Sequence, residues 1–293
     1  MHRGKKLGLD SAAAVAFLSH AHSDHLGAVG SNNEIIASKE TLVLADVDGE
    51  SAVVEGARLI DAGHILGARQ LVLEGEEKII YTGDISFKPN IFGFSAKMEE
   101  CDRLIMESTY AAPEYRFRDT FEVYAELAKW VTAKSSSNLI IGAYELGKAQ
   151  EIVRVLNEYC KIAPIVPERA DDVCSVYEEF GYKLDRLAVG SDEAEEAMKR
   201  SFVAVVPMRL AKRSFAQKLE TAFERETLVA VATGWAMKYR YNADAAFTLS
   251  DHADFEDLVG YVEHSGAKTV EFFEGDGRKV LDAAGKRLCC LNV

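Results

Sequence analysis

The chain has 293 residues, of which 48% are apolar, and a formal net charge of −13 at pH 7. A chain of this length and composition can bury one large core or two moderate ones, which excludes a disordered or fibrous protein. The acidic balance counts against a nucleic-acid partner, because binding to phosphates normally draws on clustered Lys and Arg.

The N-terminal part predicts strands and no targeting segment. Basic residues precede an apolar stretch as in a signal peptide, but Asp10 interrupts that stretch. No apolar run approaches the ~20 residues needed to span a bilayer. Residues 13–110 then alternate short apolar runs with Gly-containing turns, a pattern typical of strands with few helices. These runs are residues 15–18, 35–36, 71–73, 78–81 and 103–106.

Residues 20–25 read His-Ala-His-Ser-Asp-His directly after the first apolar run. A strand alternates its side chains, so His20 and His22 leave its end on one side and can bind one ion. Asp24 and His25 lie in the turn beyond, where they can reach a second ion. Imidazole suits zinc, and imidazole with carboxylate suits zinc, manganese or iron. The spacing predicts a metal site rather than a few surface histidines.

Two downstream segments complete the predicted site. Residues 61–68 read Asp-Ala-Gly-His-Ile-Leu-Gly-Ala, and residues 81–84 read Tyr-Thr-Gly-Asp. Alone, His64 would be a buried, hydrogen-bonded histidine and Asp84 a helix cap or turn residue. Beside the first cluster, both are candidate metal ligands.

The second half alternates helices and strands. Apolar residues at helical spacing predict a helix over 119–134, and 148–159 is again helical. Residues 138–143, 202–206 and 228–232 have the composition of strands, whereas 255–264 predicts a helix and 269–273 a strand. The pattern favours an α/β cassette, at about residues 115–235, inserted into a second domain.

The motifs together resemble a known family. In order, HAHSDH, AGHILGA and YTGD are similar to the motifs of the metallo-β-lactamase superfamily. Residues 106–110 (MESTY), 142–151 (GAYELGKAQE) and 250–254 (SDHAD) resemble its β-CASP nucleases, of the mRNA 3′-end processing and DNA ligase-associated exonuclease-like types. The resemblance implies a metallo-β-lactamase αββα sandwich, residues 1–114 and 236–293, with an inserted α/β β-CASP-like domain, residues 115–235.

The resemblance also assigns roles to site residues. It implies that His20, His22 and His64 bind one metal ion, that Asp24 and His25 hold a second, and that Asp84 bridges the two. Two zinc ions per chain are expected, with manganese an alternative at the second position. Glu107 and His252 match the acid and the histidine that face each other beside the scissile phosphate. Without the resemblance, these two are a capping glutamate and a surface histidine. The expected catalytic residues are Asp24, Asp84, Glu107 and His252.

One position departs from the family. RNA-processing members end a strand with a His-Gly pair that supplies a last ligand, whereas this chain has Glu274-Gly275. A carboxylate can bind zinc, so Glu274 is a candidate ligand of the second ion. Alternatively it points to solvent and the second site is weak or empty.

Substrate contacts are expected in the later half. Lys148 lies in the GAYELGKAQE segment, and Lys238 and Arg240 are among the basic residues that gather there, so we predict that these three bind substrate. The alternative is ordinary surface charge on helices. The aromatic rings of Trp235, Tyr239 and Tyr241 either stack on nucleic-acid bases or belong to the core.

Partners and location follow from other features. Only residues 6–9 can form a strand before the metal cluster, so the sandwich is trimmed at one edge, which we hypothesise a homodimer covers. The five cysteines are odd in number and show no CxxC spacing, which indicates reduced thiols in a cytoplasmic protein. The chain carries no appended RNA-binding domain, so we expect a protein partner to supply any targeting.

Three functions stay open. The first is a zinc-dependent nuclease that hydrolyses RNA or single-stranded DNA by a two-metal hydroxide mechanism, with His252, oriented by Glu107, steadying charge or protonating the leaving oxygen. The second is a lactone or thioester metallohydrolase, which would not need the Glu107 and His252 segments. The third is a catalytically weakened nucleic-acid-binding subunit of a processing complex, which Glu274 alone supports.

Overall fold

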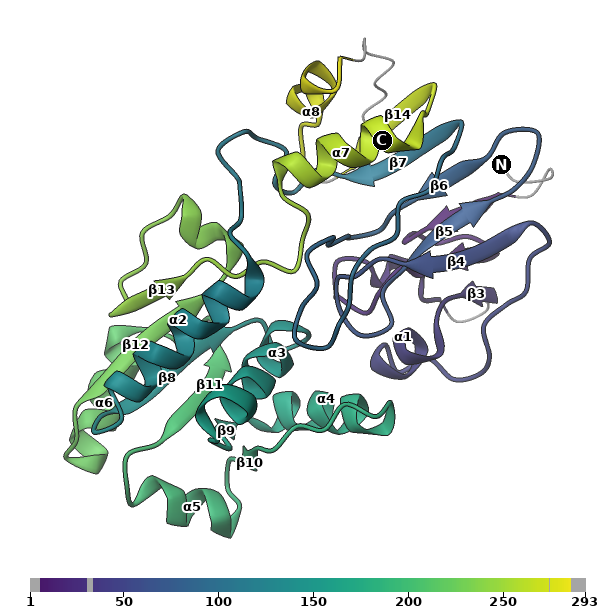
Figure 1. The fold of residues 1–293 in the computed structure, drawn as a ribbon. Coiled ribbons are helices and arrows are strands. Elements are labelled where there is room, and N and C mark those ends of the chain that lie inside the picture. The colour runs from purple at the N-terminus through teal and green to yellow at the C-terminus, as the bar shows by residue number, and fades with distance from the viewer. Residues whose placement is uncertain (1–5, 31–33, 274, 286–293) are drawn as a thin grey trace. The chain divides into compact units, whose positions relative to one another are not determined.

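The computed structural model describes residues 6–30, 34–273 and 275–285 (Figure 1). The chain forms two compact units. The first unit comprises Met1–Pro89, Gly93–Arg116 and Asp251–Val293, and the second comprises Asn90–Phe92 and Phe117–Ser250. A strand that follows residue 235 joins the sheet of the second unit. The predicted bounds of the family domains, residues 1–114 and 236–293 for the sandwich and 115–235 for the insert, stay a prediction.

Two sheets build the first unit. Strands β1 (Leu7–Leu9), β2 (Val15–Phe17) and β3 (Glu34–Ile36) form a parallel sheet in that order. The second sheet has the order β14-β7-β6-β5-β4. Its strands are β4 (Ala57–Asp61), β5 (Arg69–Leu73), β6 (Ile79–Tyr81), β7 (Arg103–Glu107) and β14 (Thr269–Phe273). Because β5 is antiparallel to both β4 and β6, and β7 and β14 are parallel to β6, strands β4, β6, β7 and β14 end at the same edge.

The main core of the first unit lies between the two sheets. Phe17 of β2 packs in one cluster with Leu71 of β5, whereas its neighbour Leu18 packs with Leu42 of helix α1 (Lys39–Leu44). This alternation is the period of two that a strand imposes on its side chains. The small sheet is therefore covered by the large sheet on one face and by α1 on the other.

Helix α7 (Phe255–Ser265) packs on the other face of the large sheet. Its buried Tyr261 donates a hydrogen bond to Gln70 Oε1 of β5 at 2.7 Å. The short helix α8 (Arg278–Ala283) follows β14. The layers are thus helix, sheet, sheet, helix, which confirms the predicted αββα sandwich.

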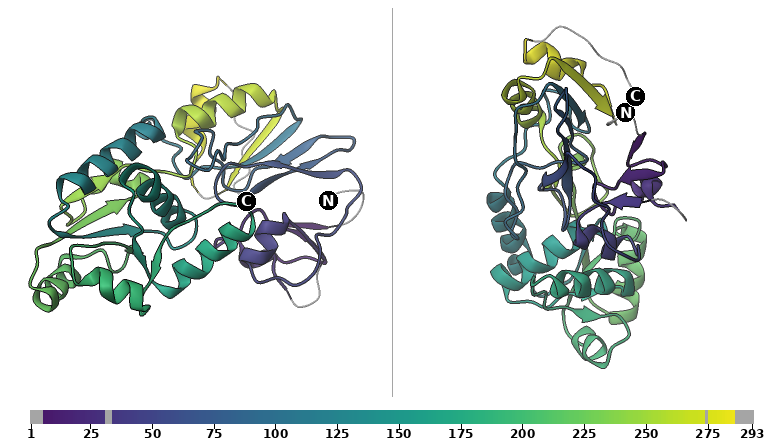
Figure 2. Two further views of the ribbon diagram at one scale, coloured as in Figure 1. Left: turned by 60° about the horizontal axis from the view of Figure 1, so that its bottom comes forward. Right: turned by 90° about the vertical axis from the view of Figure 1, so that its right-hand side faces the viewer.

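The second unit is a parallel α/β sheet with the order β10-β9-β11-β8-β12-β13. Its strands are β8 (Asn138–Ala143), β9 (Ile165–Val166), β10 (Leu187–Ala188), β11 (Val203–Pro207), β12 (Thr227–Ala232) and β13 (Ala245–Phe247). Its helices are α2 (Thr120–Ala133), α3 (Lys148–Val155), α4 (Glu168–Glu179), α5 (Asp192–Met198) and α6 (Arg213–Phe223). Helices α2 and α3 lie on one face of the sheet and α6 lies on the other (Figure 2).

Burial explains why the two central strands could be predicted from the sequence. Every residue of β8 and β12 is buried, so both read as continuous apolar runs, as parallel strands covered on two faces do. The helix predicted over residues 148–159 is confirmed as α3 followed directly by a π-helical turn, η2 (Leu156–Cys160). Helix α1 and strand β4 were not predicted, since five or six residues show too little periodicity.

Two general features bear on location. Among the described residues, no helix is both long and apolar enough to cross a membrane. The three cysteines in that part of the chain, Cys101, Cys160 and Cys174, are free thiols. Location in the cytoplasm stays a prediction.

Candidate metal centre

The candidate ligands lie where strands of the first unit end. His20 and His22 follow β2, His64 lies between β4 and β5, and Asp84 comes three residues after β6. Glu107 is the last residue of β7. The large sheet thus brings residues far apart in the sequence to a single edge.

Two glycines make the close approach of these loops feasible. Gly83, before Asp84, has φ +54°, and a Cβ there would lie 2.5 Å from Ser19 Cβ. Gly63, before His64, has φ +73°, and a Cβ would lie 2.2 Å from the Ser86 carbonyl oxygen. Only glycine fits both the left-handed backbone and the space.

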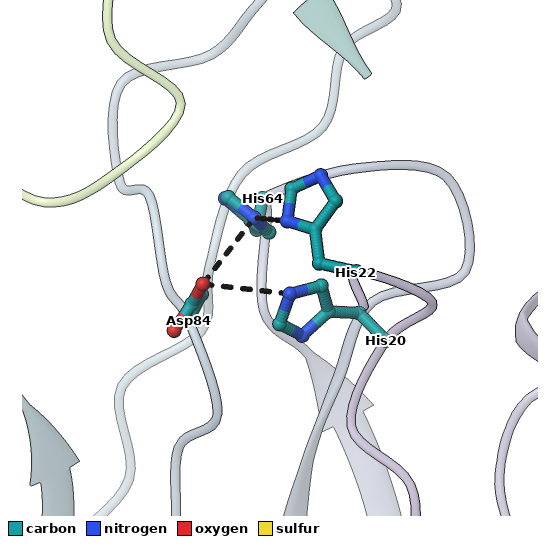
Figure 3. Close-up of side chains that lie close together, drawn as sticks. All are labelled: His20, His22, His64 and Asp84. Atoms are coloured by element: carbon teal, nitrogen blue, oxygen red, sulfur yellow. Dashed lines mark hydrogen bonds and ion pairs between the residues drawn. The ribbon is translucent and has the colours of Figure 1, made fainter. Parts of the chain in front are cut away.

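Three imidazoles and one carboxylate converge at this edge (Figure 3). Asp84 Oδ2 lies 3.4 Å from His20 Nε2 and 3.5 Å from His64 Nε2. His64 Nε2 lies 3.1 Å from His22 Nδ1. One ligand atom from each of the four residues lies within 4.8 Å of the others.

Asp84 also faces a fifth residue. Its other oxygen, Oδ1, lies 3.5 Å from Nε2 of the buried His25. One carboxylate oxygen therefore lies beside the three-imidazole group and the other beside His25. This geometry suits a carboxylate placed between two ions.

Hydrogen bonds fix which nitrogen of each ring is available. His64 Nδ1 lies 2.7 Å from the Asp251 carbonyl oxygen. A carbonyl oxygen can only accept a hydrogen bond, so His64 Nδ1 is the donor. Ser19 Oγ donates to Asp10 Oδ2 at 2.6 Å, so it accepts from His20 Nδ1 at 2.9 Å. Both rings thus carry their proton on Nδ1 and present the Nε2 lone pair to Asp84.

The electrostatic environment favours neutral imidazoles. Burial, and then the neighbouring histidines, lower the pKa of His20 well below its usual 6.5. Burial, and then His252, likewise lower the pKa of His64. Neutral imidazole is the form that binds metal.

The residues present fit a divalent cation. His20 Nε2 is buried and has no hydrogen-bond partner among the described residues, although such atoms are normally satisfied. Three imidazole nitrogens and a carboxylate oxygen form a donor set typical of zinc. A metal ion would satisfy the His20 nitrogen.

Asp10, which we noted only as a break in an apolar stretch, supports two of the histidines. Its Oδ2 accepts from His25 Nδ1 at 2.8 Å and from the Tyr81 hydroxyl at 2.9 Å, and its Oδ1 accepts from Ser19 N at 2.7 Å. It orients His25 directly and His20 through Ser19. The only signal in the sequence was a lone acid between apolar residues.

Replacing Asp10 with asparagine should weaken metal binding by about 10- to 100-fold, because the amide cannot orient the two histidines as the carboxylate does. Asparagine tolerates the left-handed backbone of this position, φ +46°, so the turn is retained. Competition with a chromogenic chelator would measure the affinity. Asp46→Asn, at another aspartate with positive φ (+54°), is the control. Equal affinities in the two variants would contradict this role.

Glu107 and His252 form a pair beside the cluster. Glu107 is fully buried, its Oε1 accepts from Ile85 N at 2.6 Å, and its Oε2 accepts from His252 Nδ1 at 2.9 Å. His252 Nε2 lies 3.9 Å from Asp84 Oδ2. Burial lowers the pKa of His252, but the carboxylates of Glu107 and Asp84 outweigh it and raise the pKa to about 10. The pair therefore holds a cationic imidazole next to the candidate metal ligands.

One described candidate ligand, Asp24, is not brought into this cluster. Asp24 is exposed, and neither Asp24 nor His25 belongs to the three groups of potential ligand atoms found in the described part of the chain, although His25 lies beside Asp84. Glu274 lies outside the described residues. The roles of Asp24 and Glu274 stay predictions.

Lys148, a predicted substrate contact, is buried in the second unit. Its side chain is 1% exposed and its Nζ donates to Glu151 Oε2 at 2.5 Å. Tyr124, on α2, donates to the other oxygen of Glu151. This buried ion pair gives Lys148 a structural role in the second unit, and substrate binding by Lys148 stays a prediction.

Replacing Glu151 with glutamine should destabilise the second unit by about 3–5 kcal/mol, because the buried ammonium of Lys148 would lose its counter-charge. Glu158→Gln is the control, since Glu158 pairs with Arg154 through a side chain that is 42% exposed. That change should cost less than about 1 kcal/mol. Urea unfolding measures both, and similar losses would contradict the structural role.

Lys238 and Arg240, the other predicted substrate contacts, are exposed residues of the second unit. Lys238 Nζ lies 5.8 Å from the ring centroid of Tyr239. Substrate binding by these two residues stays a prediction.

Comparison with known proteins places the site in a family. No family profile matches the sequence. The chain is 30% identical to a probable DNA ligase of Opitutus terrae over 89% of this chain and 26% of that protein. It is 28% identical to an RNase J-like protein of Methanocaldococcus jannaschii, over 52% of this chain and 45% of that protein. It is 24% identical to the 5′ exonuclease Apollo of Gallus gallus, over 86% of this chain and 56% of that protein.

The chain belongs to the β-CASP family of the metallo-β-lactamase superfamily. Its fold is accordingly the metallo-β-lactamase αββα sandwich with an inserted α/β domain. A crystal structure of a protein of unknown function from Enterococcus faecalis V583 shares the fold, with a TM-score of 0.57 and 13% identity over 88% of this chain and 74% of that one. This β-CASP chain spans between about a quarter and about a half of the length of the curated relatives named here.

Proposed function

We propose that the chain is a metal-dependent nuclease that hydrolyses phosphodiester bonds of RNA or single-stranded DNA. The observation that carries this proposal is the buried group of three imidazoles and Asp84 beside the Glu107–His252 pair. The names of the relatives, which include an RNase J-like protein and a 5′ exonuclease, support it.

We assign the metal ligands from the geometry and the family resemblance. His20, His22, His64 and Asp84 would hold one divalent ion. His25 and Asp84, with Asp24 and Glu274 from the sequence prediction, would hold a second. Zinc suits this donor set, and manganese is the alternative for the second ion. When bound, such ions supply Lewis acidity, which activates water and neutralises charge on phosphate oxygens.

The chain's own residues would handle the proton. His252 carries a proton near Asp84, with its Nδ1 held by Glu107 and its Nε2 3.9 Å from Asp84 Oδ2. From there it can protonate the leaving oxygen of a phosphodiester, which is general acid catalysis. Glu107, bound to Ile85 N and not in contact with solvent, is a positioning residue that keeps the ring in place and charged.

The same pair argues against the alternatives. A lactone or thioester hydrolase would not need a buried glutamate that holds a second histidine beside the metal cluster. A catalytically weakened subunit would be expected to lose part of this constellation, whereas the described candidate metal ligands other than Asp24 lie together beside Glu107 and His252. We further propose that the protein is cytoplasmic, acts on nucleic acid and forms a homodimer. A mass in solution equal to that of a monomer would contradict the homodimer.

Cleavage assays on a panel of substrates test the proposal. Single-stranded RNA and DNA, each labelled at either end, a duplex, and lactone and thioester substrates would be incubated with the full chain and zinc or manganese. We expect cleavage of at least one single-stranded nucleic acid, with the label position giving the polarity. Hydrolysis of an ester but of no nucleic acid would overturn the proposal in favour of the esterase.

A further inference from the structure

A set of aromatic residues lies at the carboxyl edge of the sheet in the second unit. Strands β8 and β12 are neighbours in parallel register, with Gly142 opposite Val231. Tyr144 follows β8, and Trp235, in the 3-10 helix η3 (Gly234–Met237), follows β12. Ligands of open parallel α/β sheets bind outside this edge, so exposed side chains there are candidate contacts.

These aromatic rings are unusually exposed. Tyr144 is 50% exposed and Tyr239 is 53% exposed. The half-buried Trp235 supports Tyr239, with ring centroids 5.9 Å apart and planes at 44°. Tyr241, also half-buried, packs against the apolar cluster of the sheet. We call Tyr144, Trp235, Tyr239 and Tyr241 the aromatic surface.

Geometry connects three of the four residues: the Trp235 ring adjoins Tyr239, and Tyr144 and Trp235 follow the paired strands β8 and β12. Burial raises the pKa of Tyr241, and the nearby phenols of Tyr144 and Tyr239 raise it further. The aromatic surface thus combines two half-buried rings, Trp235 and Tyr241, with two rings that are about half exposed, Tyr144 and Tyr239.

Two exposed cations adjoin Tyr239 of the aromatic surface in an otherwise acidic chain. Residues 205–250 contain seven Lys and Arg and four Asp and Glu, a net charge of 7 − 4 = +3, against −13 for the whole chain. Lys238 and Arg240 flank Tyr239 and are exposed. Two nearby acids are in ion pairs, Glu145 with Arg209 at 3.0 Å and Asp244 with Arg213 at 3.2 Å. The local charge is complementary to a polyanion.

We propose that the aromatic surface binds single-stranded nucleic acid, with unpaired bases stacked on Tyr239 and Tyr144 and phosphates contacted by Lys238 and Arg240. Exposed rings beside cations are how proteins hold single strands without reading sequence. A duplex offers paired bases that cannot stack on these rings, so the surface selects single strands. The inference rests on the proposed function for its substrate class and adds the contacts that select within it.

Binding measurements on full-length variants test this inference. An Asp84→Asn background prevents cleavage, and fluorescence anisotropy would report binding of a labelled 12-nucleotide oligothymidylate. Tyr239→Ala should raise the Kd about tenfold, and Tyr239→Phe should change it less than about twofold, because the ring is retained. Tyr159→Ala is the matched control, since Tyr159 is 44% exposed elsewhere on the same unit.

An abasic oligonucleotide of the same length separates stacking from charge. Its Kd should be unchanged by Tyr239→Ala, because it has no bases to stack. The proposal would be overturned by three results: an unchanged Kd for oligothymidylate in Tyr239→Ala, an equal loss for the abasic strand, or no binding by the parent protein. An unchanged Kd of Tyr239→Ala for oligothymidylate would favour a protein partner as the ligand of the aromatic surface.

The inference and the proposed function fail separately. If the wild-type chain cleaves nucleic acid while Tyr239→Ala retains the parent affinity, the inference is wrong and the function stands. If the wild-type chain cleaves no nucleic acid but binds oligothymidylate through the Tyr239 ring, the proposed function is wrong and the inference stands.

Discussion

Asp84→Asn should abolish nuclease activity, lowering the cleavage rate by at least about 10³-fold, because the carboxylate lies between the two candidate halves of the metal centre. One oxygen lies 3.4 Å from His20 Nε2 and the other 3.5 Å from His25 Nε2. An amide has no negative charge and offers only one acceptor oxygen, so it cannot serve both sides. The metal content should fall together with the rate.

Single-turnover cleavage and elemental analysis on the same preparation would measure both effects. Asp61→Asn is the matched control, since Asp61 ends β4 in the same unit but has a side chain that is 43% exposed and pairs with Lys97. It should retain rate and metal. An Asp84→Asn protein that keeps both would show that this cluster is not the metal centre.

His252→Ala should slow cleavage by about 10²- to 10⁴-fold, the usual contribution of a positioned general acid. Its metal content should stay that of the wild type, because His252 is the proposed proton donor rather than one of the proposed ligands. Glu107→Gln should give a smaller loss, since the imidazole stays in place but loses the carboxylate that raises its pKa. Loss of rate without loss of metal separates this pair from the ligands.

His264→Ala is the control for the second prediction, because His264 is an exposed histidine at the end of α7. It should leave both the rate and the metal content unchanged. Full phosphodiesterase activity in His252→Ala would mean that the role assigned to His252 is wrong. Loss of metal in that variant would instead make His252 a ligand.

Local sequence predicted much of the fold. Strands β8 and β12 are buried on both faces and therefore read as apolar runs, and α2 has apolar residues at helical spacing. Strand β13 of the second unit was not predicted. Strand β13 has three residues and joins the sheet only through its pairing with β12, so no local pattern marks it.

The candidate site was predictable where spacing carries the chemistry. His20 and His22 follow one strand, and their separation by two residues already placed both side chains together. Asp10 was missed because its partners Ser19 and His25 are nine and fifteen positions away and meet it only in the folded unit. The burial of Lys148 could not be predicted from the sequence either, because its ion pair with Glu151 is buried only when α3 packs in the folded unit.

The most direct test of the metal-dependent nuclease is removal and return of the metal. The purified full chain would be treated with a chelator, analysed for metal, and assayed on end-labelled single-stranded RNA and DNA before and after addition of zinc or manganese. The account predicts bound metal in the untreated protein, loss of cleavage after chelation, recovery on metal addition, and no recovery in His20→Ala. Cleavage that survives complete removal of the metal, or that persists in His20→Ala, would contradict it.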